Sequence, residues 1–128
     1  MLACEASLTS VEHWLPVPLD WADADASPPM KVRFHVDAAH FAAANASAPI
    51  FLHMGGEGTT DYANCGASSA AHGALCVALE HRFYGQSLPH TPLTTEVYRS
   101  GLSVANALAD AAAVVDVIRA TYALPRAP

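Results

Sequence analysis

Residues 74–89, with the sequence ALCVALEHRFYGQSLP, pass from a continuous apolar run directly into charge. Glu80, His81 and Arg82 follow the last leucine of the run at once and lead into a Tyr-Gly turn. An apolar run that ends abruptly in charge is typical of a parallel strand whose carboxyl end opens into a crevice, where open α/β sheets bind their ligands. We therefore expect a buried strand over 74–79 with a crevice at its end.

Three other segments have strand patterns. Residues 11–19 and 30–36 alternate partly between apolar and polar side chains, which is typical of half-exposed antiparallel strands. The prolines of the first segment suit the edge of a sheet. Residues 49–54 form a second continuous apolar run, which predicts an inner parallel strand beside 74–79.

The helices are predicted from the segments that follow the two apolar runs. Residues 55–73 read as a glycine-rich loop and then a short helix of small residues, which gives a β-loop-α-β crossover. After a loop with several prolines that reaches about Thr94, apolar residues recur at spacings of three and four and predict a long helix that ends near Leu124 and Pro125. The expected apolar stripe is Val104, Leu108, Ala111, Val115, Ile118 and Tyr122, with Asp110, Asp116 and Arg119 off it.

Composition excludes several classes of protein. The chain has 128 residues, enough for one ordinary domain, and its net charge of −6 comes from 12 acidic and 6 basic residues. It has no basic cluster that would neutralise phosphates, so a nucleic-acid partner is not expected. No apolar run approaches the roughly 20 residues that span a bilayer. The start MLACEASLTS lacks the basic and long apolar regions of a signal peptide.

The cellular compartment is not decided by these residues. Cys4, Cys65 and Cys76 are an odd number of cysteines, and the sequence does not show which of them pair. Asn45 begins an Asn-Ala-Ser triplet in a polar segment, which is an acceptor for N-glycosylation and would suit a secreted glycoprotein.

Gly55, Gly56, Glu57 and Gly58 follow directly on the first apolar run. Glycines at this point let backbone N–H groups turn inward, as in the loop of α/β hydrolases that supplies one donor of the oxyanion hole. A turn that only connects a strand to a helix fits the same four residues equally well. A Walker phosphate loop and a dinucleotide fingerprint are both excluded, because their remaining residues are missing.

No residue stands in a convincing nucleophile or metal-ligand pattern. Ser68 in GASSA and Ser103 in GLSVA imitate a nucleophile elbow, but no strand is expected directly before either of them. We expect Ser103 to cap the long helix instead. Seven histidines invite a metal hypothesis, yet Cys65, His72 and Cys76 match no standard zinc spacing, so no metal site is expected.

Three motifs in order resemble one family of serine peptidases, which includes lysosomal Pro-X carboxypeptidase, dipeptidyl peptidase II and thymus-specific serine protease. They are APIFLHMGGEG (48–58), ALEHRFYGQSLP (78–89) and ANALADAAAVVDVI (105–118). VPLDW (17–21) and VRFHV (32–36) resemble the opening strands of the family. One departure is Asp20-Trp21-Ala22, where the family usually has Asp-His-Phe.

The resemblance implies that residues 1–128 are the amino-terminal part of a single α/β-hydrolase domain: two edge strands, a β-loop-α-β unit and a long helix, truncated before the nucleophile strand. The cap and the catalytic triad are then absent, so this chain should be inactive alone. The implied full-length enzyme is a serine-type carboxypeptidase or dipeptidyl peptidase that cleaves peptide substrates after proline without a cofactor. The family implies a lysosomal or extracellular location and leaves a homodimer open.

The same resemblance implies where the charged residues after the second apolar run lie in the fold. Glu80, His81 and Arg82 should lie at the carboxyl end of the fourth strand, with Tyr84 and Gly85 turning the chain beside the crevice. We expect Glu80 and Arg82 to have structural roles, through ion pairs or through bonds to buried carbonyls, and not to act as acid or base. Two alternatives remain for the chain as a whole: an inactive binding module, and a fragment of an α/β-hydrolase esterase.

Overall fold

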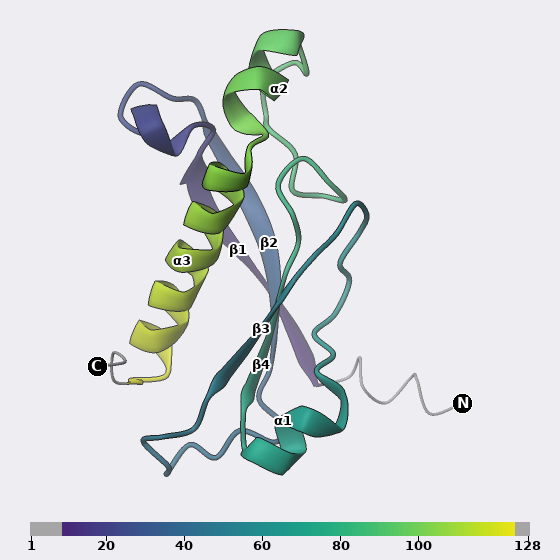
Figure 1. Ribbon diagram of the computed structural model, residues 1–128, viewed down its shortest axis with the longest axis vertical. Helices are drawn as coiled ribbons and strands as arrows, with labels where there is room; N and C mark the ends of the chain where they lie inside the picture. The colour runs from purple at the N-terminus through teal and green to yellow at the C-terminus, as the bar shows by residue number, and fades with distance from the viewer. Residues whose placement is uncertain (1–8, 125–128) are drawn as a thin grey trace.

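The computed structural model describes residues 9–124 as a four-stranded sheet with a long helix along one face (Figure 1). The strands are ordered β1-β2-β4-β3 across the sheet. β1 and β2 are antiparallel, as are β2 and β4, whereas β3 and β4 are parallel. The strands are β1 (Ser10–Pro18), β2 (Pro29–Asp37), β3 (Ile50–Met54) and β4 (Leu75–Leu79), and the helices are η1 (Trp21–Asp23), α1 (Gly66–His72), α2 (Thr95–Gly101) and α3 (Val104–Thr121).

All four predicted strands form, and the mixed α/β architecture is confirmed. One face of the sheet packs against α3 through Val32 and Phe34 of β2 and Val77 of β4. α3 contributes Val114 and Ile118 to the same core. This cluster is the main hydrophobic core of the described chain, so β4 is covered on this face along its whole length.

The prediction that β2 is half-exposed was wrong, because the opposite face of the sheet is also covered. Arg33 and His35 of β2 point to that face and are only 4% exposed. The chain between β3 and α1 lies over them, where the Thr60 carbonyl bonds His35 Nε2 at 2.9 Å. A disulfide between Cys65 and Cys76 fastens the end of this segment to β4. The polar residues Arg33 and His35 on this strand therefore did not mean that their face of the sheet is exposed to solvent.

The predicted apolar stripe of α3 was wrong in part: Ala111, Ile118 and Tyr122 pack in or against the core as expected, but the first residues of the stripe do not. Val104 and Leu108 are 77% and 61% exposed, whereas Asp110, which the pattern placed off the stripe, is 1% exposed. The helix buries a face that lies about one residue away from the predicted one. Alanines occupy much of the helix and do not indicate which side is buried. The carboxylate of Asp110 can be buried because Arg82 forms an ion pair with it. The buried residues are Asn106, Ala107, Asp110, Ala111, Val114 and Ile118.

The segment before α3 contains a second helix that the pattern did not predict. α2 is capped by Thr94, whose hydroxyl accepts a hydrogen bond from the amide of Val97 at 3.3 Å. α3 then starts anew at Ser103, whose hydroxyl accepts from the amide of Asn106 at 3.1 Å, as predicted. Among residues 9–124, no single helix is long and apolar enough to cross a membrane, and α2 and α3 meet that test only as a pair bent by 57°.

β3 lies at the edge of the sheet and pairs only with β4 in the part of the chain that the structure describes. Its apolar side chains are accordingly less covered than those of β4. Ile50, Phe51 and Leu52 are half-buried and Met54 is 36% exposed, while every residue of β4 is buried. The carboxyl ends of both parallel strands meet at the same end of the sheet, where the candidate site begins.

Candidate functional site

The segment that follows β3, residues 55–60, is called the glycine loop. It is held by a hydrogen bond at its start and is exposed in its middle. The amide of Gly55 donates to the carbonyl of Leu79 at 2.7 Å. A Cβ at Gly55 would lie 2.6 Å from Thr60 Oγ1 and 2.8 Å from that same carbonyl, so only glycine fits there. Gly56, Glu57 and Gly58 are exposed. Within residues 9–124, no hydrogen bond engages the amide of Gly56 or Glu57.

The carboxylate of Glu80 is fully buried directly after β4 and accepts four hydrogen bonds. Oε2 accepts from Arg33 Nη2 at 2.7 Å and from the amide of Thr60 at 2.9 Å. Oε1 accepts from the amide of Gln86 at 2.9 Å and from the hydroxyl of Ser87 at 2.8 Å. One side chain thus joins β2, the glycine loop and the turn after β4.

The charge state of Glu80 follows from these four donors. Burial alone would raise the pKa of its carboxyl, but the bonds from Arg33, Thr60, Ser87 and Gln86 outweigh burial and hold the pKa below its usual value. Burial would likewise lower the pKa of Arg33, yet its carboxylate partners raise it. The pair is therefore ionised. Two exposed carboxylates, Glu12 at 3.2 Å and Asp61 at 3.1 Å, add weaker bonds to the same guanidinium.

The turn after β4 wraps closely around this carboxylate. Gly85 has a φ of 55°, and a Cβ at this position would overlap the carboxylate of Glu80. Phe83 also has a positive φ, 71°, which is rare for a bulky residue, and its amide donates to the Ser87 carbonyl at 2.8 Å. His81 and Tyr84 stack edge to face with ring centroids 5.3 Å apart. Gly85 thus lies against Glu80, and His81 against Tyr84, in the turn that follows β4.

Arg82 points the other way, towards α3, and all five of its N–H groups are used. Nε and Nη2 form a two-pronged pair with Asp110, at 2.7 and 2.8 Å. The remaining bonds go to the carbonyls of Pro18, Leu19 and Gly101, at 3.1, 2.6 and 2.8 Å. Both predicted structural roles are thus present in one residue, as ion pair and as carbonyl donor. This anchor has no bond to the glycine loop.

Two partners of the anchor were missed by sequence reasoning. The sequence around Asp110 has an ordinary helical pattern. The only sign of its burial is that small apolar residues surround it. Trp21 belongs to the departure from the expected family pattern noted in the sequence, and its Nε1 donates to Asp110 at 2.8 Å. The amide of Trp21 donates to Asn106 Oδ1 at 2.9 Å. The departure from the family pattern is therefore accommodated by α3.

Within the part of the chain that the structure describes, the other residues singled out in the sequence make no hydrogen bond to Glu80 or Arg82. Ser68 is exposed within α1, and Ser103 caps α3, so neither follows a strand. Asn45 is exposed in the loop before β3. Cys4 lies outside the described residues. No cluster of three His, Cys, Asp or Glu residues within 9–124 has the geometry to hold a metal ion.

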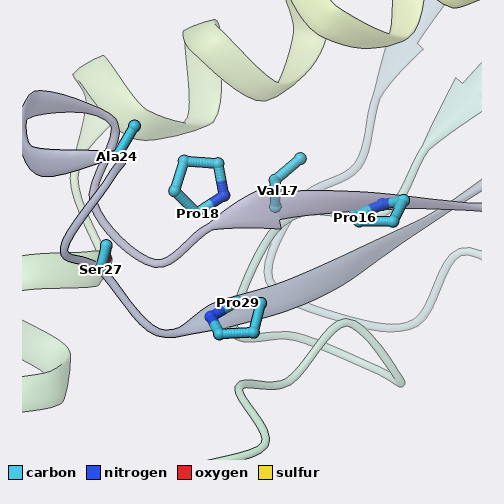
Figure 2. Close-up of a pocket in the computed structure, with 6 residues that line it drawn as sticks. All are labelled: Pro16, Val17, Pro18, Ala24, Ser27 and Pro29. Carbon is cyan, nitrogen blue, oxygen red and sulfur yellow. The ribbon is translucent and has the colours of Figure 1, made fainter.

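Figure 2 shows a separate hollow of about 220 Å³ beside the β1–β2 hairpin. The only hydroxyl in its lining belongs to Ser27, and this hydroxyl accepts a hydrogen bond from the amide of Asp20 at 2.8 Å. No carboxylate, imidazole or amine lines it, so it lacks groups for acid or base chemistry. The lining residues are Pro16, Val17, Pro18, Ala24, Ser27 and Pro29.

Comparison with known proteins gives the class of protein that the chain resembles, the serine peptidases. Residues 18–126 match the family model described as Serine carboxypeptidase S28. The chain belongs to this serine carboxypeptidase S28 family, which confirms the resemblance of its amino-terminal motifs.

Two relatives show the extent of the likeness. The chain is 38% identical over 106 residues to a thymus-specific serine protease of Mus musculus, a match that covers 79% of this chain and 20% of the relative. It is 40% identical over 85 residues to the Homo sapiens thymus-specific serine protease, covering 61% of this chain and 15% of the relative. The chain therefore spans a fifth or less of the length of these relatives.

Proposed function

We propose that this chain is the amino-terminal part of a serine-type exopeptidase with an α/β-hydrolase fold, and that its glycine loop supplies one donor of the oxyanion hole. The observation that carries the proposal is that, within residues 9–124, the amides of Gly56 and Glu57 have no hydrogen-bond partner and lie just after the carboxyl end of a parallel strand. Family membership supports the reaction class. The nucleophile, the base and the orienting acid come from the remainder of the full-length enzyme.

The chemistry requires backbone donors that are already in place. When a serine attacks a peptide carbonyl, the carbonyl oxygen becomes an oxyanion, and fixed N–H groups stabilise it without reorganisation. The amide of Gly55 does not serve, because it donates to the carbonyl of Leu79. The candidates are therefore Gly56 and Glu57.

The variant Gly56→Pro tests this assignment in the full-length protein. Removing one oxyanion donor typically lowers kcat about 10²- to 10³-fold, so we expect a loss of that size with the fold intact by circular dichroism. Gly56→Ala is the matched comparison, because it keeps the N–H and its Cβ would meet no atom within 4 Å. Its kcat should lie well above that of Gly56→Pro. An unchanged rate in Gly56→Pro would reject Gly56 as the donor.

Substrate preference is tested with two peptide series, because the family resemblance leaves two exopeptidase activities open. One series carries proline next to the last residue and the other carries proline second from the amino end. Release of the final residue would identify a carboxypeptidase, and release of a dipeptide would identify a dipeptidyl peptidase. Cleavage of neither series, with hydrolysis of simple esters instead, would contradict the exopeptidase proposal and favour an esterase.

We also propose that the protein enters the secretory pathway and reaches a lysosomal or extracellular location. The Cys65–Cys76 disulfide supports this, because disulfides persist in oxidising compartments. Asn45 is exposed and available to a glycosyl transferase. Protein from secreting cells should shift in mobility after glycosidase treatment, and Asn45→Gln should remove the part of the shift that this site contributes. Identical shifts in the variant and the wild type would contradict the use of Asn45.

A further inference from the structure

We propose that Glu80 is a positioning residue, whose buried carboxylate holds the glycine loop in the geometry that presents its free amides. The inference rests on the proposed function. That function needs backbone N–H groups that are fixed before the reaction, and we assign the task of fixing them to Glu80. Glu80 touches no substrate in this role and acts through the loop.

The loop is closed at both ends by two consecutive residues. At its start, the amide of Gly55 donates to the carbonyl of Leu79, at 2.7 Å. At its end, the amide of Thr60 donates to the carboxylate of Glu80, at 2.9 Å. The first bond is a backbone bond that extends the sheet, and the second depends on a side chain. The position of the end of the loop is therefore set by Glu80.

The same carboxylate also fixes the opposite side of the rim. Its second oxygen accepts from the amide of Gln86 and the hydroxyl of Ser87, both in the turn after β4. That hydroxyl in turn accepts from the amide of Arg33, at 2.9 Å. A single buried charge thus sets the spacing between the glycine loop and the turn that faces it.

Only an ionised carboxylate satisfies this arrangement. Four donors converge on its two oxygens, and two of them are backbone amides that are fixed in place. A glutamine side chain has one oxygen and an NH₂ group, so in either orientation two of the four donors would face another donor. Glu80→Gln therefore keeps the size of the side chain and releases one side of the rim.

The test compares Glu80→Gln with Asp110→Asn in the full-length protein, with kcat and KM measured per folded molecule on a peptide that the wild type cleaves. Both variants replace a buried ion-paired carboxylate by an amide, but Asp110 lies on the α3 face and has no bond to the loop. Both should lower Tm. We expect Glu80→Gln alone to lower kcat, about 10- to 100-fold, with KM changed by less than about threefold. Equal kcat values in the two variants would overturn the inference.

Amide hydrogen exchange tests the positioning role of Glu80 without relying on enzyme activity. In the wild type, the amides of Thr60 and Gln86 should be protected, and Glu80→Gln should speed the exchange of the one that faces the new NH₂ group about tenfold or more. Asp110→Asn should leave both unchanged. If Glu80→Gln does not fold, Thr60→Pro removes the loop-side amide donor together with the threonine side chain and should lower kcat in the same way, whereas Thr60→Ala, which keeps the amide, should not. A wild-type enzyme that cleaves no peptide would contradict the proposed function. Unchanged exchange at both Thr60 and Gln86 in Glu80→Gln would contradict the positioning role by itself.

Discussion

At the scale of single residues, Gly85 provides the space that the Glu80 carboxylate occupies. A Cβ at Gly85 would overlap that carboxylate, and its φ of 55° is unfavourable for other residues. Gly85→Ala should therefore lower the free energy of unfolding by at least about 2 kcal/mol. Gly58→Ala is the control, since its Cβ would meet nothing within 4 Å, and should change stability by less than about 0.5 kcal/mol. Equal melting temperatures would contradict the close fit around Glu80.

His35 should set how stability responds to mild acid. Burial lowers its pKa below the ordinary 6.5, so the folded protein binds this proton less readily than the unfolded chain does. Its contribution is fully present above about pH 6.5 and is lost as pH falls through the lower folded pKa. Melting of the full-length protein between about pH 8 and pH 5 should show Tm falling with acid.

A matched variant separates His35 from the other titrating groups. His35→Gln keeps an N–H that can reach the carbonyl of Thr60, but it does not titrate, so the decline of Tm between about pH 6.5 and 5 should flatten. Glu80 has a lowered pKa and should lose its contribution only in stronger acid, below its usual 4.5. A decline of the same slope in His35→Gln would contradict the assignment to His35.

The residues of the rim were predictable from the sequence, and their partners were not. Glu80 and Arg82 stand two residues apart directly after a continuous apolar run, a pattern that predicts ionisable residues at the end of a strand. Their partners, Arg33 and Asp110, come from β2 and α3, far away in the chain, and no local pattern joins them. The buried charge pairs are tertiary contacts, so only the fold assigns them.

At the scale of elements, the face of α3 that packs on the sheet is decided by the Arg82–Asp110 pair as much as by apolar residues. Removing one partner of a buried pair leaves an uncompensated charge and costs about 3 to 5 kcal/mol. Asp110→Ala should therefore lower the melting temperature of the full-length protein strongly. Asp116→Ala, on the exposed side of the same helix, should change stability by less than about 0.5 kcal/mol. Equally small effects of the two substitutions would contradict the observed burial of Asp110.

Periodicity predicted that α3 exists and where it lies, but it did not predict which side is buried. Apolar residues occur around the whole helix, and alanines tolerate both core and surface. The start of the helix was predictable, because Ser103 is a capping residue at the expected place. In the same way, the glycine loop was predictable as a loop after β3. Its passage over Arg33 and His35 was not, because loop paths depend on long-range bonds.

At the scale of the whole molecule, the free edge of β3 governs how the isolated chain behaves. β3 pairs only with β4 within residues 9–124, and its half-buried side chains lie beside unpaired backbone groups, which are a template for aggregation. We expect the chain expressed alone to be insoluble, oligomeric or molten, and to become soluble when the remainder of the enzyme is supplied. Size-exclusion chromatography and a thermal melt measure this. A monodisperse monomer with a sharp transition would favour an independent binding module.

We propose that this chain contributes the oxyanion loop of a serine peptidase and not its nucleophile. Labelling the full-length protein with a fluorophosphonate, followed by mass spectrometry of its peptides, tests this claim most directly, because the reagent modifies only an activated serine. We predict one labelled serine outside residues 1–128, with weaker labelling in Gly56→Pro, and no labelling of the isolated chain. Labelling at Ser68 or Ser103, in either protein, would contradict the account.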